Sequence, residues 1–215
     1  MNKLVVFDLD GTLIDSLPDI AYFVNETLEN FGAKKKSIGD VRAYIGNGAR
    51  NLIKRAFDNK LSESELDERL AYYACAYKGS NSPLTIVFDG IKCVINELKK
   101  RGYKLAVLTN KPQDQTDKIF HRLLGDCGFD AVVGERAYRK RKPDPTELIN
   151  LMNQFGAEKE STFMVGDGET DVQTAINAGV NSICVLWGYR SKAQLETAGA
   201  TNFINKAEEL LNFIK

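Results

Sequence analysis

The segment of residues 3–16 reads KLVVFDLDGTLIDS, and it decides the fold of this chain. Its apolar run at 4–9 is interrupted only by Asp8, which predicts a strand buried on both faces, as strands of parallel sheets are. Asp10 follows at the edge of a turn begun by Gly11. Two carboxylates at the end of a buried strand oppose folding, because they repel each other and lose hydration. We therefore expect a positive group beside them.

The composition indicates one sizeable core and no strongly charged surface. The chain has 215 residues, 43% of them hydrophobic, and its 29 Lys and Arg residues balance 29 Asp and Glu residues. Because the net charge is zero, no overall field attracts nucleic acid or an anionic membrane, and neither is expected as a partner. No apolar run approaches the roughly 20 residues that a membrane-spanning helix needs.

The amino terminus and the cysteines indicate the compartment. The chain enters its first expected strand directly, which argues against a signal peptide. No two cysteines form a C-x-x-C pair, so zinc is not expected, and each thiol suits a small apolar residue of the interior. The four cysteines are Cys75, Cys93, Cys127 and Cys184. We expect a cytoplasmic protein that is a monomer or a homodimer.

Residues 16–84 have the pattern of an all-helical domain. Apolar residues recur at three- and four-residue spacing from Ile20 to Phe31, which predicts an amphipathic helix. Ser62 and Glu65 form a capping box at the start of a later helix. The turn-rich sequences DSLPD and SNSPL bracket the block. We expect a helical cap domain inserted after the first strand.

From residue 85 onward, strand patterns alternate with helix patterns. Such alternation predicts an α/β fold, a doubly wound parallel sheet with helices on both faces. The domain prediction is therefore a core of 1–15 and 85–215 with the cap at 16–84. Strands after the first are expected at 103–109, 129–134, 162–166, 182–188 and 201–204.

Polar residues follow several of these strands, at the edge where open parallel sheets bind ligands. If the strands are neighbours, four carboxylates, a hydroxyl, an amide and an ammonium converge on one pocket. Oxygen ligands without His or Cys favour a hard cation, and Mg2+ is the usual choice beside a phosphate. The candidate residues are Asp8, Asp10, Thr109, Asn110, Lys142, Asp167 and Asp171.

The chemistry available to the first two carboxylates is phosphoryl transfer. A carboxylate such as Asp8 can act as a nucleophile and form an aspartyl-phosphate. Asp10 can protonate the leaving oxygen and later deprotonate water. The hydroxyl and the ammonium suit the oxygens of a phosphoryl group.

The chain resembles the haloacid dehalogenase superfamily, specifically its phosphatases with a helical cap after the first strand. The resemblance covers essentially the whole chain. It is carried by DLDGT (8–12), LTN (108–110), KPDP (142–145) and GDGETD (166–171). Within the family, VRAYIGNGARNLIKRA (41–56) and LWGYR (186–190) are most similar to phosphoglycolate phosphatases, which implies 2-phosphoglycolate as the substrate.

The resemblance implies a role for each motif residue. Asp8 is the nucleophile, Asp10 is the acid/base, and Lys142 neutralises the phosphoryl oxygens that Thr109 and Asn110 bind.

For the metal, the resemblance implies that Mg2+ is held by Asp167, Asp8 and the main-chain carbonyl of Asp10. Asp171 supports the metal directly or through another group.

Simpler interpretations stay open for several of these residues. Asp167 and Asp171 could cap the helix that begins near residue 170, and Thr109 could pack as a β-branched strand residue. The basic run RKRK at 139–142 could be a solvated surface run with Lys142 turned inward.

A cap loop, IGNG at 45–48, also has two interpretations. Gly46 and Gly48 could simply allow a turn that opens a helix. Alternatively, the backbone N–H groups of Gly46, Asn47 and Gly48 could bind a substrate carboxylate at the helix N-terminus. Arg50 is a second candidate for a substrate anion.

Four other functions use the same fold. A pyrophosphatase or another small-metabolite phosphatase keeps the mechanism and changes the substrate. A phosphosugar mutase keeps the core residues and returns the phosphoryl group to a sugar. A dehalogenase has no need of Asp10 or a metal, and a non-catalytic regulator has no need of an intact set of catalytic residues.

Overall fold

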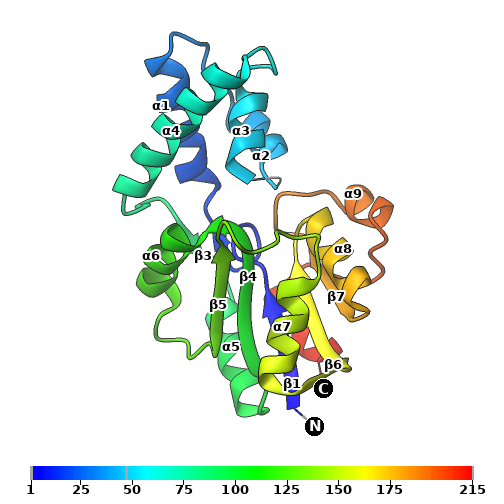
Figure 1. Cartoon of the computed structure of the whole chain (residues 1–215). Helices are drawn as coiled ribbons and strands as arrows, with labels where there is room; N and C mark the ends of the chain where they lie inside the picture. Colours follow the sequence, from blue (N-terminus) through cyan, green and yellow to red (C-terminus); the bar gives the residue numbers. More distant parts are fainter. Residues whose placement is uncertain (1, 47, 215) are drawn as a thin grey trace. The chain divides into compact units, whose positions relative to one another are not determined.

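The computed structural model describes residues 2–46 and 48–214, which form two compact units. One unit is Met1–Asp15 with Val87–Lys215, and the other is Ser16–Ile86. The second unit contains the segment whose apolar spacing is helical. The first contains the alternating segments, and it has the expected α/β class (Figure 1).

The first unit is built on a six-stranded parallel sheet with the order β5-β4-β1-β6-β7-β8. Its strands are β1 (Asn2–Phe7), β4 (Lys104–Pro112), β5 (Ala131–Glu135), β6 (Ala157–Gly166), β7 (Asn181–Val185) and β8 (Phe203–Ile204). Two short strands, β2 (Ile14–Asp15) and β3 (Ile86–Val87), lie where the chain leaves and re-enters this unit. Strand β1 is central, because β4 and β5 lie on one side of it and β6, β7 and β8 lie on the other. In open parallel sheets, ligands bind at the carboxyl ends of the strands where the strand order reverses in this way.

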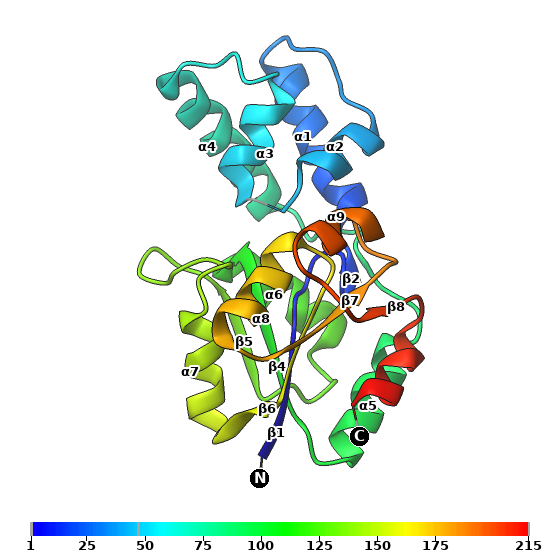
Figure 2. The same ribbon diagram turned by 90° about the vertical axis from the view of Figure 1, so that its right-hand side faces the viewer.

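Helices cover both faces of this sheet, and the alternation of side chains along β1 shows how. Val5 and Phe7 face one apolar cluster with residues of α5 and α6, whereas Leu4 and Val6 face another with residues of α7 and α8. Figure 2 shows α7 and α8 on one side of the strands and α5 on the other. The helices of this unit are α5 (Ile91–Lys100), α6 (Gln113–Leu124), α7 (Thr146–Phe155), α8 (Glu169–Ala178), α9 (Lys192–Thr197), the 3-10 helix η1 (Ala207–Glu209) and α10 (Leu210–Phe213).

Each of the five later strands has boundaries that differ from the sequence prediction, and β6 and β7 are the clearest cases. Strand β6 begins at Ala157 rather than at 162, because Ala157 pairs with Asn2 at the amino end of β1. Strand β7 ends at Val185 rather than 188, so the prediction for the last three residues was wrong. Those residues belong to a loop in which the Tyr189 N–H turns back toward the site.

The second unit is a bundle of α1 (Leu17–Asn30), α2 (Ile38–Tyr44), α3 (Gly48–Ala56) and α4 (Glu63–Gly79). The capping box expected at Ser62 is present, with Glu65 N–H donating to the Ser62 hydroxyl. A second capping box, Ser37 with Asp40, begins α2. The helical unit has an apolar core of its own, which consists of Ile20, Ala21, Phe23, Val24, Leu28, Val41, Leu52, Ile53, Ala56, Leu66, Tyr73 and Tyr77.

Within the described residues, no helix is both long enough and apolar enough to cross a membrane.

Candidate active site

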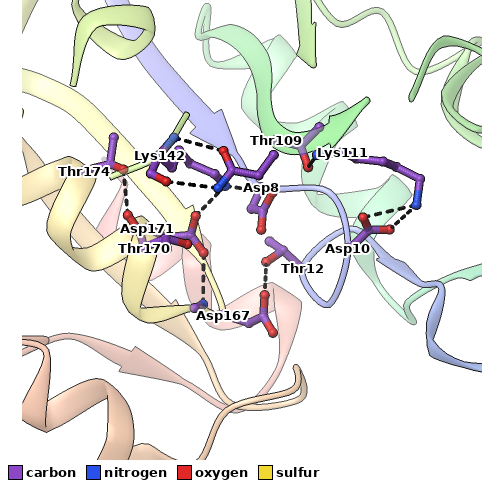
Figure 3. A network of polar contacts seen from close by, with 12 residues as sticks. Asp8, Asp10, Thr12, Thr109, Lys111, Lys142, Asp167, Thr170, Asp171 and Thr174 are labelled. Atoms are coloured by element: carbon purple, nitrogen blue, oxygen red, sulfur yellow. Dashed lines mark hydrogen bonds and ion pairs between the residues drawn. The ribbon is translucent and has the colours of Figure 1, made fainter. Parts of the chain in front are cut away.

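Four acidic and basic side chains meet at the carboxyl ends of β1 and β6 (Figure 3). Asp8 directly follows β1, and Asp167 directly follows β6. Asp171 lies in the first turn of α8, which begins three residues after β6. Lys142 comes from the loop between β5 and α7. Since β1 and β6 are paired neighbours, residues far apart in the sequence become adjacent.

Lys142 is a positive group of the kind that the opening segment required, and it lies beside Asp8. Its Nζ lies 2.8 Å from Asp8 Oδ1 and 2.5 Å from Asp171 Oδ1, and its side chain is 2% exposed. Asn110 fixes the Lys142 main chain, because its side chain accepts from the Lys142 N–H at 2.9 Å and donates to the Lys142 carbonyl at 3.0 Å. The ammonium therefore sits between two carboxylates on a braced loop.

Asp171 caps α8, which is one of the two roles that the sequence left open, and its role beside a metal stays a prediction. Its Oδ2 accepts from the Gly168 N–H at 2.9 Å, which caps α8. Its other oxygen pairs with Lys142. Capping thus orients this carboxylate without using the oxygen that faces Lys142.

The side chain of Asp167 is buried, and one of its contacts is with a main-chain N–H group. The Tyr189 N–H donates to its Oδ2 at 2.7 Å, and the Thr12 hydroxyl donates to its Oδ1 at 3.3 Å. A Cβ atom at Gly11 or at Gly188 would collide with the Asp167 carboxyl group. Gly11 also has φ +82°, which side chains with a Cβ rarely adopt. The glycine of DLDGT is therefore needed both for the turn and for the space beside Asp167.

The pKa values show that negative charge in this site is only partly compensated. Burial, together with the charges of Asp8 and Asp171, raises the pKa of Asp167 to about 8. Burial also raises the pKa of Asp8 to about 6, although Lys142 opposes the rise. Burial disfavours the ammonium of Lys142, but Asp171 and Asp8 outweigh it and raise its pKa above the ordinary lysine value. Another cation would relieve the remaining repulsion between carboxylates.

The acidic cluster fits a hard metal ion. Asp8, Asp167 and Asp171 each offer a carboxylate oxygen, and these oxygens lie within 4.8 Å of one another. An all-oxygen donor set in this spacing, buried and short of positive charge, suits Mg2+ better than a thiolate- or imidazole-seeking metal. The Asp10 side chain is not part of this cluster, so only its main-chain carbonyl stays a predicted ligand.

Asp10 instead pairs with a residue that the sequence analysis missed. Lys111 Nζ lies 3.1 Å from Asp10 Oδ1 and 3.2 Å from Oδ2. The available signal was LTNK, in which Lys111 directly follows the two predicted phosphate-binding residues. A lysine at the end of a strand is common at surfaces, and the sequence alone does not show that this one is buried.

The predicted phosphate-binding residues lie on the same edge. Thr109 is buried near the end of β4, where its hydroxyl accepts from the Lys111 N–H at 3.2 Å. Asn110 holds the Lys142 main chain. Their contact with a phosphoryl group stays a prediction.

Most of the basic run is structural. Arg139 donates to the Gln113 side chain and the Gly134 carbonyl, and Arg141 pairs with Glu135. Lys140 lies 3.3 Å from Asp144. Within the described residues, Lys142 is the member of the run that reaches the acidic cluster.

The loop after β7 is held by two further contacts. The Arg190 Nε lies 2.9 Å from Glu169 Oε2. The Trp187 Nε1–H donates to the Thr12 carbonyl at 3.1 Å. This loop is thereby fixed beside the turn that contains Thr12, where its Tyr189 N–H reaches Asp167.

The predicted cap loop lies in the helical unit. Gly46 has φ +114° and Gly48, the first residue of α3, has φ +79°, so both adopt the conformation that favours glycine. Asn47 is outside the described residues. Arg50 pairs with Glu63 and Asp67, each at 2.5 Å within the same unit.

Comparison with known proteins identifies the family. Residues 5–185 match the family model described as haloacid dehalogenase-like hydrolase. The match covers most of the chain and includes every motif that carried the resemblance to the superfamily. The chain belongs to the haloacid dehalogenase-like hydrolase family and is an enzyme of the hydrolase class.

Its relatives within the family have a common name. The chain is 33% identical over 216 residues to "Phosphoglycolate phosphatase" of Pseudomonas putida, covering 98% of this chain and 79% of that protein. It is 33% identical over 187 residues to the protein of the same name from Aquifex aeolicus, and the match covers 87% of this chain and 86% of that protein.

Solved structures agree with the sequence relatives. A Lactobacillus delbrueckii subsp. bulgaricus protein described as a candidate phosphoglycolate phosphatase has a TM-score of 0.93 at 28% identity, covering 100% of this chain and 99% of its own. A predicted phosphoglycolate phosphatase from Haemophilus somnus has a TM-score of 0.87 at 28% identity, covering 100% and 98%. The α/β fold and the helical insertion are therefore shared along the full length.

Proposed function

We propose that this chain is a Mg2+-dependent phosphomonoesterase that hydrolyses 2-phosphoglycolate through an aspartyl-phosphate on Asp8. The observation that carries the proposal is the group of half-buried Asp8 and buried Asp167 and Asp171, with buried Lys142, at the carboxyl ends of β1 and β6. A carboxylate with a neighbouring ammonium and a hard-cation site is suited to attack a phosphoryl group, whose oxygens carry negative charge.

In the first step, an oxygen of Asp8 attacks phosphorus and the bond from phosphorus to the ester oxygen breaks. Asp10 gives its proton to that oxygen, so the alcohol leaves neutral. In the second step, water attacks the phosphorus of the aspartyl-phosphate while Asp10 takes its proton. Phosphate leaves, and Asp8 is restored as a carboxylate. Lys142 stays beside the transferring oxygens through both steps and offsets their charge.

Asp8, Asp167 and Asp171 would hold Mg2+, with the Asp10 carbonyl as the further ligand implied by the resemblance. When bound, the ion supplies positive charge that shields the phosphoryl oxygens from the attacking carboxylate. The Tyr189 N–H and the Thr12 hydroxyl orient Asp167 for this task.

The substrate assignment rests on the relatives. The Pseudomonas and Aquifex proteins are both named phosphoglycolate phosphatase, and the chain covers more than three quarters of each. We propose that the helical unit Ser16–Ile86 acts as a cap that selects the substrate and excludes water. Its hinges would be the turn-rich borders near residues 15–18 and 81–83.

The test is phosphate release by the full chain from a panel of phosphomonoesters. The panel contains 2-phosphoglycolate, pyrophosphate, nucleotides and sugar phosphates, each with Mg2+ and with EDTA. Asp8→Asn is expected to lower the rate by at least about 10⁴-fold, because the nucleophile is lost. Asp126→Asn, whose side chain is 77% exposed in the same unit, is the matched control and should keep full activity.

The outcomes separate the parts of the proposal. A preference for 2-phosphoglycolate that disappears with EDTA and with Asp8→Asn supports it in full. Asp8-dependent release that favours pyrophosphate or another ester keeps the mechanism and rejects the substrate. Turnover that requires a bisphosphate indicates a mutase, and the absence of Asp8-dependent release rejects a phosphatase.

A further inference from the structure

The helical unit contains a groove of about 520 Å³ that the proposed active site does not use. Helix α1, the end of α4 and the segment after α4 line it, and every lining residue belongs to Ser16–Ile86. On α1 the lining residues form one stripe, because they recur at three- and four-residue spacing. They are Asp19, Tyr22, Phe23 and Glu26. The volume of the groove is typical of a site for a small molecule.

Much of the groove wall is apolar and open to solvent. Tyr22 and Leu84 are each more than half exposed, although both are large apolar side chains. The Phe23 ring packs against the Tyr77 ring of α4, with ring centroids 5.2 Å apart. Single exposed apolar residues are common on protein surfaces, but apolar residues gathered at one groove indicate a binding surface.

Two carboxylates belong to the same wall. Asp19 is 1% exposed, and its Oδ2 accepts from the Thr85 hydroxyl at 2.5 Å. Glu26 is half-buried, and its Oε1 accepts from the Tyr72 hydroxyl at 3.3 Å. Among the described residues, neither carboxylate has an ion-pair partner, and no Lys, Arg or His lines the groove. The first turn of α1 stabilises Asp19 in part, but carboxylates that contact only neutral hydroxyls stay short of positive charge.

The spacing of the two carboxylates sets the length of a matching ligand. Asp19 and Glu26 are seven positions apart on α1, which is about 10 Å along a helix axis. Tyr22 and Phe23 lie between them in the stripe, and aromatic rings attract both organic cations and apolar chains. A molecule with an ammonium at each end of an apolar chain therefore matches the charge, the spacing and the wall of the groove.

We propose that this groove binds a linear organic dication, in which about 10 Å of apolar chain separates two ammonium groups. One ammonium pairs with Asp19, the other pairs with Glu26, and the chain packs against Tyr22 and Leu84. Long aliphatic diamines and polyamines have this chemistry. None of these residues belongs to the proposed catalytic set, so binding does not depend on the proposed phosphatase activity.

Isothermal titration calorimetry of the full chain tests this site. Excess Mg2+ is present, so that the acidic cluster of the α/β unit does not take up the amine. The probe is 1,8-diaminooctane, whose extended chain is long enough to join the two carboxylates. The comparison molecules are 1-aminooctane, which has one charge, 1,8-octanediol, which has none, and 1,4-diaminobutane, which is too short.

The same titrations are made with variants that remove one carboxylate at a time. Glu26→Gln and Asp19→Asn keep the shape of the side chain, and Asp19→Asn keeps an oxygen that can accept from the Thr85 hydroxyl. Glu29→Gln is the matched control, because it removes the same charge from α1 at a well-exposed position outside the groove. Circular dichroism and thermal melting verify that each variant is folded.

The expected result is tight binding of the long diamine alone. Its dissociation constant should be below about 1 mM and at least about fivefold lower than those of the three comparison molecules. Glu26→Gln should raise it about fivefold, and Asp19→Asn should raise it at least about 10-fold because Asp19 is more deeply buried. Glu29→Gln should leave it within about twofold of the wild type.

Other results would overturn the inference. Equal affinity for the diol would show that the groove takes apolar chains regardless of charge. Equal affinity for 1-aminooctane or 1,4-diaminobutane would exclude pairing with both carboxylates. Equal losses in Glu26→Gln and Glu29→Gln would show that only the net charge matters, and the absence of saturable binding up to about 10 mM would exclude the site. If Asp19→Asn does not fold, Glu26→Gln and the series of molecules decide.

Discussion

The two units of this protein use charge in opposite ways. In the α/β unit, Lys142 and Lys111 have side chains only 2% and 4% exposed, and each lies within ion-pair distance of carboxylates. In the helical unit, Arg50 is 40% exposed and its partner Glu63 is 77% exposed. Water screens the second kind of pair but hardly screens the first. Removing one charge should therefore be severe in the sheet unit and mild in the helical unit.

The largest effect is expected for Lys142→Met. Without the ammonium, Asp8 and Asp171 lose their shared counter-ion. Phosphate release should fall by about 10³-fold or more, and the free energy of unfolding without Mg2+ should fall by about 3–5 kcal/mol. Urea unfolding and phosphate release measure the two quantities.

Arg50→Ala in the helical unit is the matched control for that variant. Its melting temperature should change by no more than about 2 °C, because exposed ion pairs contribute little. A loss of stability as large as that of Lys142→Met would contradict the contrast between the two units.

A smaller effect is expected for Gly11→Ala, which tests space beside Asp167 rather than charge. Its new Cβ would collide with the Asp167 carboxyl group at φ +82°. We expect activity to fall by about 10²-fold and the free energy of unfolding to fall by about 1–2 kcal/mol.

Gly32→Ala in the helical unit separates strain from crowding. Gly32 has φ +67° but has no atom within 4 Å of a Cβ at this position. The Gly32→Ala variant should lose about as much free energy of unfolding as Gly11→Ala, and it should keep the kcat of the wild type. If both variants keep full activity, Gly11 is needed only for the turn.

A further expected effect concerns the pH dependence of Mg2+ binding. The pKa of Asp167, about 8, lies above the ordinary aspartate value of 3.8, so without metal the folded chain binds an extra proton. The free energy of unfolding should then fall as pH rises from about 4 to about 8. Because Mg2+ needs the carboxylate, its stabilising effect should be larger at about pH 8.5 than at about pH 6, by about 2–3 kcal/mol.

Thermal melting with and without Mg2+ at the two pH values measures this difference. Asp167→Asn should remove it, since the variant has no proton to displace. A stabilisation by Mg2+ that does not depend on pH in the wild type would contradict the assignment of Asp167 as a ligand.

Much of this site was predictable because its chemistry is local in the sequence. DLDGT predicted a buried strand that ends in two carboxylates, and β1 ends at Phe7 immediately before Asp8. The same reasoning predicted a positive group beside the two carboxylates; Lys142 lies beside Asp8, and Lys111 lies beside Asp10. The order of the strands in the sheet is not set by neighbouring residues in the sequence. However, the rules for crossovers between parallel strands leave few possible strand orders.

Contacts between residues on strands that are far apart in the sequence were not predictable in the same way. Lys111 and Asp10 are 101 residues apart, and they meet only because β1 and β4 pair in the register that sets Phe7 opposite Val107. Asn110 was predicted to bind phosphate, but its side chain also braces the Lys142 main chain. Neither contact has a signal in the spacing of residues along the chain.

The sequence alone determined the α/β class, the helical insertion and the carboxylates at the strand ends, because periodicity and turn residues act over a few positions. Only the tertiary structure decided which charges compensate one another. Lys142 pairs with Asp8 and Asp171, whereas Lys111 pairs with Asp10, and this division depends on strand pairing and burial. Burial fixes the strength of each interaction, since a charge pair gains its effect only where water is excluded.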